Sequence, residues 1–381
     1  MTLPFRFELL RGEAPSGPRR GRAETPHGVF ETPCFAPVGT RASVKGILPG
    51  QLREAGVSLL LCNTYHLALR PGEDLVREAG GLHRFMAWDG PILTDSGGYQ
   101  VFSLEGRRTV TDEGVEFAGA EAGAALRLDP RRALEIQRDL GSDIAMVLDE
   151  CPPHDCPPAR LRGAHRRTLL WAERARRVHL EMGGVERGQA VFGILQGGAD
   201  ENLRREAAEV LVGLDFDGYA IGGVSVGEPK ETMRRTVEIT TPHLPVERLR
   251  YLMGVGDPDD LFECALRGID LFDCVAPTRH GRNNLVFVPE GELKIRNAKF
   301  KRDFRPLQEG CPCPACRNHS RAYIRHLALA KEMLAGILQS LHNLRFLQDL
   351  MRGLRERLEE GAPEADLREW FRAKYPGWAS P

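Results

Sequence analysis

The chain has 381 residues, of which 42% are hydrophobic and 28% are charged, a composition typical of a globular protein with a large core and not of a disordered chain. Its formal net charge of −1 excludes a general electrostatic attraction to nucleic acid or membranes, so a polyanion would have to be bound by a local patch. The sequence shows neither an apolar signal segment nor an apolar run long enough to cross a bilayer. We therefore expect a cytoplasmic protein without membrane contact, whose scattered cysteines are reduced.

Short apolar runs alternate with helical patterns along the chain. The runs are apolar throughout, as expected of strands covered on both faces, and they lie at residues 57–65, 91–95, 143–150, 190–196, 218–224, 250–255 and 269–277. Residues 39–47 are the candidate for an eighth strand. The helical patterns between them lie at residues 131–141, 159–182, 201–214, 231–240 and 257–268. This alternation predicts an α/β fold, a closed (β/α)₈ TIM barrel, which takes about 250 residues. A doubly wound sheet is the alternative, but no G-x-G-x-x-G turn opens a helix.

Polar side chains follow several of these runs at the point where each run ends. Asp95, Asp149, Glu150 and Gln196 end three of them, and Asp273 lies within the last. In a parallel barrel the carboxyl ends of the strands meet at one mouth, where the active site forms. A single strand-end aspartate is more often a helix N-cap, but three of them beside glycine-rich turns indicate a site.

A cluster of carboxylates allows two kinds of chemistry: binding of a metal ion through oxygen, or reaction at the anomeric carbon of a sugar. Asp273 lies between Phe272 and Cys274, apolar neighbours that exclude water from a nucleophile. Asp95 precedes the segment 96–98 (SGG), whose backbone N–H groups allow close approach of a substrate or anion. The two aspartates fit the roles of nucleophile and general acid/base, although their spacing in the sequence does not decide between the two chemistries.

Basic residues follow the last strand. Arg279 and Arg282 come directly after it, and residues 294–305 (KIRNAKFKRDFR) carry six cationic side chains against a single carboxylate. A run of charge is usually a solvated face. Because this one lies between a predicted active-site strand and a cysteine cluster, we interpret it as a patch that contacts phosphates.

The cysteine cluster is Cys311, Cys313 and Cys316, spaced too closely for easy disulfide pairing but well placed for one zinc ion. Candidates for a fourth ligand are His319, His326 and His342. Spacing alone favours His319. Three cysteines and one histidine complete a tetrahedron, so the zinc would be structural.

We therefore divide the chain into a (β/α)₈ barrel, residues 1–279 plus 346–381, and a zinc-binding, basic subdomain, residues 280–345, inserted late in the barrel. Residues 104–130 have the pattern of a second, hairpin-rich insertion. The amphipathic pattern at residues 343–360 predicts a helix that packs on the barrel.

Several segments together resemble bacterial tRNA-guanine transglycosylases. They lie in order over nearly the whole chain: TDSGGYQVFSL (94–104), DECPP (149–153), GILQGG (193–198), GGVSVGE (222–228), YLMGVGDP (251–258), DLFDCVAPTRHGRN (270–283), CPCPAC (311–316) and the pair HN (342–343). The resemblance implies a zinc-carrying TIM barrel and a pentosyltransferase that exchanges guanine at the anticodon wobble position for preQ1, on the route to queuosine. It also implies a homodimer that engages one tRNA with a GUN anticodon.

The resemblance assigns roles to the strand-end residues. It implies that Asp273 is the nucleophile that forms a covalent intermediate with the ribose of the tRNA, and that Asp95 is the general acid/base. Asp149 and Gln196, with the backbone of Gly223, are expected to bind the edge of the purine.

Further roles follow from the same resemblance. The residues implied to contact the base are Tyr99 and Met253, one on each face, together with Cys151 and Val226. Arg279 and Arg282 are implied to contact the anticodon loop, and His342 is implied as the fourth zinc ligand in place of His319. Ser225 stands where this family pattern has alanine, which bears on the choice between preQ1 and related bases.

Three other functions agree less well with the sequence. A glycoside hydrolase predicts sugar-stacking tryptophans at the mouth, but the four tryptophans lie away from the strand-end carboxylates. A non-catalytic RNA-binding subunit is disfavoured because both Asp95 and Asp273 are present. A zinc hydrolase requires an open metal position, which a site with three cysteines and one histidine lacks.

Overall fold

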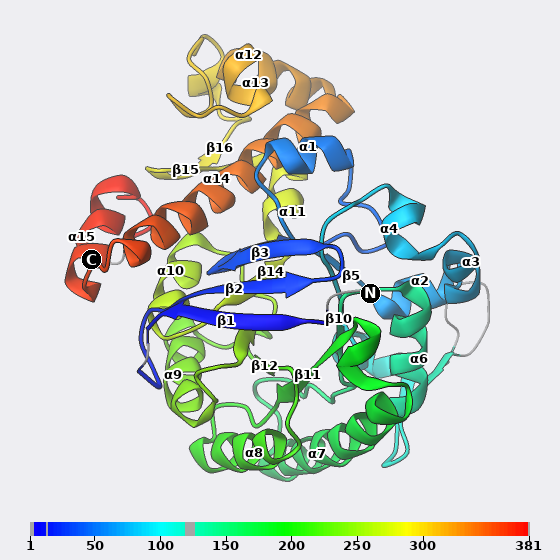
Figure 1. The fold of residues 1–381 in the computed structure, drawn as a ribbon. Helices are drawn as coiled ribbons and strands as arrows, with labels where there is room; N and C mark the ends of the chain where they lie inside the picture. The colour runs from blue at the N-terminus through cyan, green and yellow to red at the C-terminus, as the bar shows by residue number, and fades with distance from the viewer. Residues whose placement is uncertain (1–3, 13, 119–125, 380–381) are drawn as a thin grey trace.

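A computed structural model describes residues 4–12, 14–118 and 126–379. Its centre is a parallel sheet of eight strands, curled into a nearly closed barrel with helices outside it (Figure 1). The strands of the barrel are β4 (Cys34–Pro37), β5 (Leu60–Cys62), β6 (Ile92–Thr94), β10 (Ile144–Met146), β11 (Ala190–Leu195), β12 (Gly218–Ile221), β13 (Leu249–Leu252) and β14 (Leu271–Cys274). A parallel bridge between Val38 and Leu61 joins the two edges of the sheet. The predicted (β/α)₈ barrel is confirmed.

Six of the eight barrel strands lie within the predicted apolar runs, and β13 overlaps its run but begins one residue earlier, at Leu249. The residues of β5, β6 and β10–β13 are all buried. The prediction of the remaining strand was wrong. Residues 39–47 form turns, with Ala42 and Gly46 in the left-handed region at φ 54° and 78°, and the strand is instead β4, directly before them. Strand β4 has only four residues and ends in a proline, so its sequence resembles a loop.

All five predicted helices are present, as α6 (Pro130–Leu140), α7 (Pro158–Glu181), α8 (Glu201–Gly213), α9 (Lys230–Thr240) and α10 (Pro258–Leu266). Their starts follow the usual rules: α6, α7 and α10 begin with proline, and the carboxylates of Asp129 and Asp200 cap α6 and α8. The shorter helices are α1 (Pro49–Glu54), α2 (Thr64–Leu69), α3 (Glu73–Glu78), α4 (Gly81–Met86), α5 (Gly98–Ser103) and α11 (Ala276–Arg282). Across the described ranges, every helix is too short or too polar to cross a lipid bilayer.

The segment between α5 and α6 contains a small antiparallel sheet of β7 (Arg108–Val110), β8 (Val115–Phe117) and β9 (Leu126–Leu128). The hairpin-rich insertion is thus confirmed for its described part, and residues 119–125 lie outside the described residues. Val115 and Phe117 pack into the core beside α2 and α6.

After α11 the chain forms the hairpin β15 (Leu285–Val288) and β16 (Gly291–Lys294), then α12 (Pro314–Asn318) and α13 (Arg321–Ala330). The long helix α14 (Met333–Glu359) runs from this segment along the barrel and is followed by α15 (Glu364–Lys374) (Figure 1). The side chain of Gln348 donates to the carbonyl of Phe35 in β4 at 2.8 Å, so the predicted terminal helix does pack on the barrel. The division at residue 345 falls inside α14, and the two-part organisation stays a prediction.

An antiparallel sheet of β1 (Arg6–Arg11), β2 (Arg20–Thr25) and β3 (Gly28–Thr32) lies across the barrel (Figure 1). It covers the amino-terminal ends of the strands, where Arg19 donates to Asp270, just before β14, at 3.0 Å. Asp143, just before β10, accepts from His27 of the β2–β3 turn at 2.7 Å and from His83 of α4 at 3.2 Å. These contacts close the end of the barrel opposite to the predicted site.

The contact between His27 and Asp143 predicts a pH dependence of stability. The hydrogen bond to Asp143 raises the pKa of His27 above its ordinary 6.5. Burial alone would raise the pKa of Asp143 above its ordinary 3.8, but the hydrogen bonds from His27 and His83 lower it overall. The ion pair between His27 and Asp143 therefore stabilises the fold fully between pH 3.8 and pH 6.5, the ordinary pKa values of the two groups. Its electrostatic contribution is lost as the pH rises through the raised pKa of His27.

We expect His27→Gln to lower the melting temperature most between pH 3.8 and 6.5 and least at high pH. Because His27 is partly exposed, the effect should be at most ~1 kcal/mol. Thermal unfolding at a series of pH values measures this, with the exposed histidine variant His243→Gln as the control. A difference from wild type that grows above neutral pH would contradict the assignment.

Candidate active site at the carboxyl ends of the barrel strands

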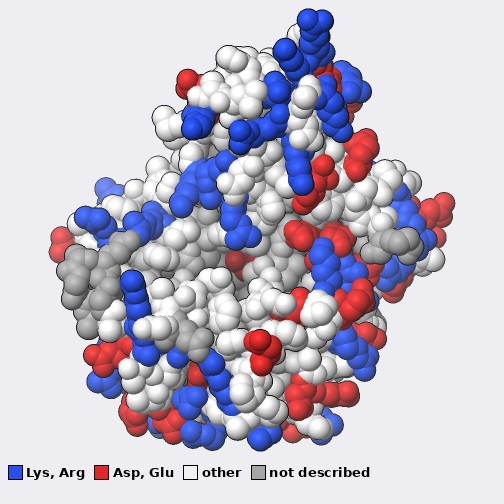
Figure 2. Space-filling view, turned by 180° about the vertical axis from the view of Figure 1, so that it is seen from behind, with Lys and Arg blue, Asp and Glu red and all other residues white. Residues whose placement is uncertain are grey.

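The face opposite to the β1–β3 sheet is hollowed at the carboxyl ends of the strands. Figure 2 shows this face, with Lys and Arg side chains gathered on one side of the hollow. The cavity has a volume of about 550 Å³. The predicted site residues that line it are Asp95, Asp149, Gln196, Asp273, Gly223, Tyr99, Met253, Cys151, Val226 and Arg279. Residues predicted from six separate segments of the sequence thus lie in one cavity, whereas Arg282 lies outside its wall.

Asp273 stands at the end of β14 and is partly exposed to the cavity. The hydroxyl of Tyr251 donates to its Oδ1 at 2.5 Å, and the backbone N–H of Gly254 donates to the same oxygen at 2.8 Å. Burial raises the pKa of Asp273, while both hydrogen bonds oppose the rise by stabilising the anion. Within the described part of the chain, the other oxygen, Oδ2, receives no hydrogen bond. A carboxylate held by one oxygen, with the second unengaged, is suited to nucleophilic attack.

Asp95 follows β6 and is held from the neighbouring strand β5. The side chain of Asn63 donates to Oδ2 at 2.6 Å, and the backbone N–H of Thr64 donates to Oδ1 at 2.7 Å. Burial raises the pKa of Asp95 to about 6; the two hydrogen bonds lower it, and the nearby carboxylates of Asp273 and Asp149 raise it further. A carboxyl group with a pKa close to neutral can both give and take a proton, which is what a general acid/base requires.

Asp149 follows β10 and is held from both neighbouring strands. Its Oδ1 accepts from Ser96 at 3.1 Å, and its Oδ2 accepts from the amide of Gln196 at 2.8 Å. Burial raises the pKa of Asp149 to about 6. The amide oxygen of Gln196 is buried and accepts no hydrogen bond from the described residues. A planar ligand with adjacent donors and acceptors can therefore pair with Asp149 and Gln196.

Two glycines give this wall its shape. A Cβ atom on Gly98 would lie 1.8 Å from Oδ1 of Asp149, and a Cβ atom on Gly223 would lie 2.3 Å from the amide oxygen of Gln196. Both distances are impossible for a real side chain. Backbone therefore approaches the polar groups of Asp149 and Gln196 directly, in space that a side chain would fill.

Less polar side chains line other parts of the cavity. Tyr99 of α5 is 58% exposed, and Met253 follows β13 half-buried; both line the cavity and offer flat or flexible apolar surface. Cys151 is buried in the wall, and burial raises the pKa of its thiol to about 12, so it stays protonated at neutral pH. Cys151 therefore contributes shape and not a nucleophile.

Residues that the sequence analysis did not single out also build the site. They are Asn63 and Thr64 after β5, Tyr251 at the end of β13, and Glu228, whose carboxylate accepts from the backbone N–H groups of Ser225 and Val226. Asn63 and Thr64 end an apolar run just as Asp95 does, so the strand-end rule could have found them. The sequence gives no indication of the role of Tyr251, because it lies within an apolar run like any other strand residue.

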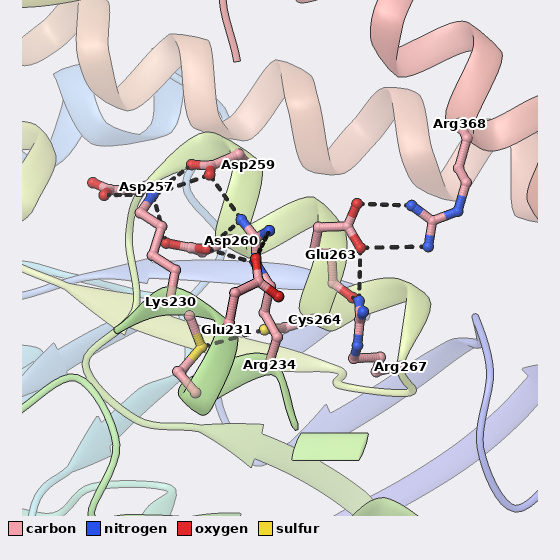
Figure 3. A network of polar contacts seen from close by, with 11 residues as sticks. Lys230, Glu231, Arg234, Asp257, Asp259, Asp260, Glu263, Cys264, Arg267 and Arg368 are labelled. Atoms are coloured by element: carbon pink, nitrogen blue, oxygen red, sulfur yellow. Dashed lines mark hydrogen bonds and ion pairs between the residues drawn. The ribbon is translucent and has the colours of Figure 1, made fainter. Parts of the chain in front are cut away.

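A network of ion pairs supports one wall of the cavity (Figure 3). Lys230, at the start of α9, lies 3.1 Å from Asp257, 2.9 Å from Asp259 and 2.8 Å from Asp260, all at the start of α10. Arg234 contacts Asp259 and Asp260 at 2.8 and 2.7 Å. Since α9 follows the loop with Gly223 and α10 follows the loop with Gly254, the network fixes these two loops relative to each other.

The cysteine cluster is a separate site in the carboxyl-terminal segment. The Sγ atoms of Cys311 and Cys313 each lie 3.7 Å from Nδ1 of His342, and Sγ of Cys316 lies 3.2 Å from it. A tetrahedral zinc ion would separate sulfur and nitrogen ligands by about 3.6 Å, so these four buried residues fit zinc. The Nε2 atom of His342 lies 2.8 Å from the carbonyl of Phe287, which leaves Nδ1 for a metal. His319 instead stacks on Tyr323, outside the cluster.

Arg279 and Arg282 both lie on α11 and are exposed. Arg279 reaches the rim of the cavity. The pKa of Arg282 is lowered, first by the burial of Arg282 itself and then by the positive charge of Arg279. The charges of Arg279 and Arg282 thus act on each other, and α11 presents positive charge beside the rim.

Comparisons with known proteins agree with this geometry. A family model described as queuine tRNA-ribosyltransferase matches residues 14–376. Proteins named queuine tRNA-ribosyltransferase from Bacillus licheniformis and Lysinibacillus sphaericus are each 52% identical, over 98% of this chain and 96% and 97% of their own lengths. The protein of that name from Geobacillus kaustophilus is 53% identical over 97% of this chain and 96% of its own length. The chain belongs to the queuine tRNA-ribosyltransferase family of transferases.

Proposed function

We propose that this enzyme exchanges the guanine at the wobble position of a GUN anticodon in tRNA for preQ1, through a covalent intermediate on Asp273. Membership of the family supports tRNA-guanine transglycosylase activity, a pentosyl transfer. The observation that carries the mechanism is the geometry of the cavity. It combines a carboxylate with one unengaged oxygen, a second carboxyl group with a pKa of about 6, and a polar edge made by Asp149 and Gln196.

In the first half of the reaction, Oδ2 of Asp273 attacks C1′ of the ribose. The bond between C1′ and N9 of guanine breaks, its electron pair moves into the purine, and Asp95 supplies the proton that neutralises the departing base. The product is an ester between Asp273 and the ribose, with inversion at C1′. Tyr251 and Gly254 stabilise the ionised carboxylate before the attack.

In the second half, the incoming base replaces guanine in the cavity. Asp95, now ionised, takes the proton from N9, the nitrogen attacks C1′, and the bond to Asp273 breaks. The second inversion restores the configuration of the original nucleoside, so the exchange proceeds with retention. The raised pKa of Asp95 suits both proton transfers.

Recognition of the base uses the polar edge. We infer that ionised Asp149 accepts hydrogen bonds from N1–H and the 2-amino group, while the amide of Gln196 and the backbone N–H of Gly223 donate to O6. Tyr99 and Met253 cover the two faces of the ring, and Cys151 and Val226 lie at its rim. The nucleotide has to leave the stack of the anticodon loop to enter the cavity.

The remaining parts of the proposal concern the partners. Arg279 lines the cavity and Arg282 lies on the same helix. We infer that these two arginines and the basic segment 294–305 contact phosphates of the anticodon loop. We infer that Cys311, Cys313, Cys316 and His342 hold one zinc ion that supplies no chemistry to the exchange and stabilises this segment. We also infer that the enzyme acts as a homodimer.

A glycoside hydrolase is the other function that two carboxylates would fit. It is disfavoured because none of the described residues that line the cavity is a tryptophan, and Trp88 and Trp171 are fully buried in the core.

We expect Asp273→Ala to reduce incorporation of radiolabelled guanine into tRNA by at least ~10³-fold, because the covalent path is lost. Wild type, but not the variant, should form a tRNA–protein complex that survives a denaturing gel. The exposed aspartate variant Asp89→Ala serves as the control and should behave as wild type. Undiminished incorporation by Asp273→Ala would refute the mechanism.

The pKa of Asp149, about 6, predicts how base binding depends on pH. Below this value the carboxyl group binds a proton and loses its ability to accept from N1–H. The KM for guanine should therefore rise as the pH falls below about 6 and stay constant above it, at saturating tRNA. Steady-state kinetics from pH 5 to 8 provide the measurement, and a constant KM over this range would argue against the role of Asp149.

The metal assignment predicts that His342→Ala loses its zinc while His319→Ala keeps one zinc ion per chain, since only His342 lies within the cluster. Zinc content by atomic absorption on the purified variants tests this. We also expect His342→Ala to melt at a lower temperature than His319→Ala. The opposite pattern of zinc retention would overturn the ligand set.

A further inference from the structure

Arg204 of α8 is fully buried directly behind the polar edge of the cavity. Its guanidinium donates to three backbone carbonyls: Nε to Gly198 at 2.8 Å, Nη1 to Leu195 at 2.9 Å and Nη2 to Gly222 at 2.8 Å. The first two carbonyls flank Gln196, and the third belongs to the peptide that carries the N–H of Gly223. One side chain thus joins the ends of β11 and β12 at the groups proposed to bind the purine.

The charge of Arg204 is unusual for a buried group. In the described ranges, no carboxylate lies within ion-pair distance of it, whereas the buried Arg19 pairs with Asp270 at 3.0 Å. Burial lowers the pKa of Arg204 to about 10, so the side chain remains charged at neutral pH. The charge of Glu228 opposes this lowering only in part. A buried cation that no carboxylate contacts costs several kcal/mol, so it is expected where a negative charge appears during function.

The peptide between Gly222 and Gly223 shows how this charge can reach the cavity. In a trans peptide the carbonyl and the N–H point in opposite directions, and the carbonyl of Gly222 points at Arg204. The N–H of Gly223 is therefore directed away from Arg204, and Gly223 lines the cavity. A hydrogen bond from a cation to the carbonyl polarises the peptide and strengthens its N–H as a donor.

We propose that Arg204 is a positioning residue of the exchange reaction: it fixes Gln196 and the Gly222–Gly223 peptide, and it strengthens their interaction with the purine as negative charge develops on the departing base. This inference rests on the proposed function, because it assumes that these groups face the purine. Arg204 itself lies behind the wall and touches no substrate.

A purely structural role is the competing explanation, since any donor could satisfy the three carbonyls. The substitution Arg204→Gln keeps an amide donor and removes the charge, while Arg204→Lys keeps the charge and loses the planar arrangement of three donors. Arg250 provides a matched control. It is equally buried and donates to the backbone carbonyls of Pro15 and Leu244, but at the opposite end of the barrel.

The experiment measures guanine exchange into tRNA by wild type, Arg204→Gln, Arg204→Lys and Arg250→Gln, with melting temperature and zinc content for each. For Arg204→Gln we expect kcat lower by about 10- to 100-fold and a raised KM for guanine, with the KM for tRNA unchanged. Arg204→Lys should retain more of kcat than Arg204→Gln and still show a raised KM for guanine. Arg250→Gln should melt earlier but keep the kinetic constants of wild type.

The role of Arg204 is overturned if Arg204→Gln loses stability as Arg250→Gln does and keeps the kcat and KM of wild type. If Arg204→Gln does not fold, Arg204→Lys decides, and wild-type constants in that variant would equally overturn the role. These outcomes leave the proposed function intact, because wild type still incorporates guanine. Absence of incorporation by wild type would instead overturn the proposed function, and the role of Arg204 with it.

Discussion

The site depends on hydrogen bonds that cross from one barrel strand to the next. Each aspartate of the cavity is held by donors from neighbouring strands: Asp95 by Asn63 and Thr64, Asp149 by Ser96 and Gln196, and Asp273 by Tyr251 and Gly254. Strand β14 pairs with β13 so that Leu271 lies opposite Tyr251, and in this register Asp273 accepts from the hydroxyl of Tyr251 and from the N–H of Gly254. The geometry of the cavity is therefore a property of the whole barrel, and a shift in register between two strands would separate a carboxylate from its donor.

The donors are neutral, and this has an electrostatic consequence. A cation beside a buried carboxylate would hold its pKa well below neutral, whereas hydroxyl, amide and backbone N–H groups only moderate the effect of burial. The pKa values of Asp95 and Asp149 consequently rise to about 6. Cations are present close by, but they lie behind the wall, as Arg204 does, in the ion pairs of Lys230 and Arg234, or at the rim, as Arg279 does. The cavity thus keeps its carboxylates reactive while its loops remain fixed.

Much of this arrangement could be predicted from the sequence, because a parallel barrel brings strand ends together whatever their distance along the chain. Asp95, Asp149, Gln196 and Asp273 were found in this way. Strand β4 could not be predicted, because four residues with a proline carry too little pattern and the turn-forming residues after it resemble a strand more closely. Tyr251 and Arg204 could not be found, since their roles depend on which groups they meet across strands. The choice of His342 over His319 needed the resemblance, because spacing in the sequence favours the nearer histidine.

The cysteine–histidine cluster affects the cavity through α14. His342 belongs to the cluster, and its neighbour Asn343 accepts from the N–H of Phe287 and donates to the carbonyls of Pro277 and Leu285. Pro277 lies on α11, the helix that carries Arg279 at the rim. Further along α14, Gln348 binds β4, which pairs with β14 beside Asp273. Because one rigid helix makes all of these contacts, a metal that orders the cluster also fixes the orientation of α11 and its arginines. The cluster lies outside the cavity, so under the proposed function it would act by positioning the arginines of α11 and not by taking part in the exchange.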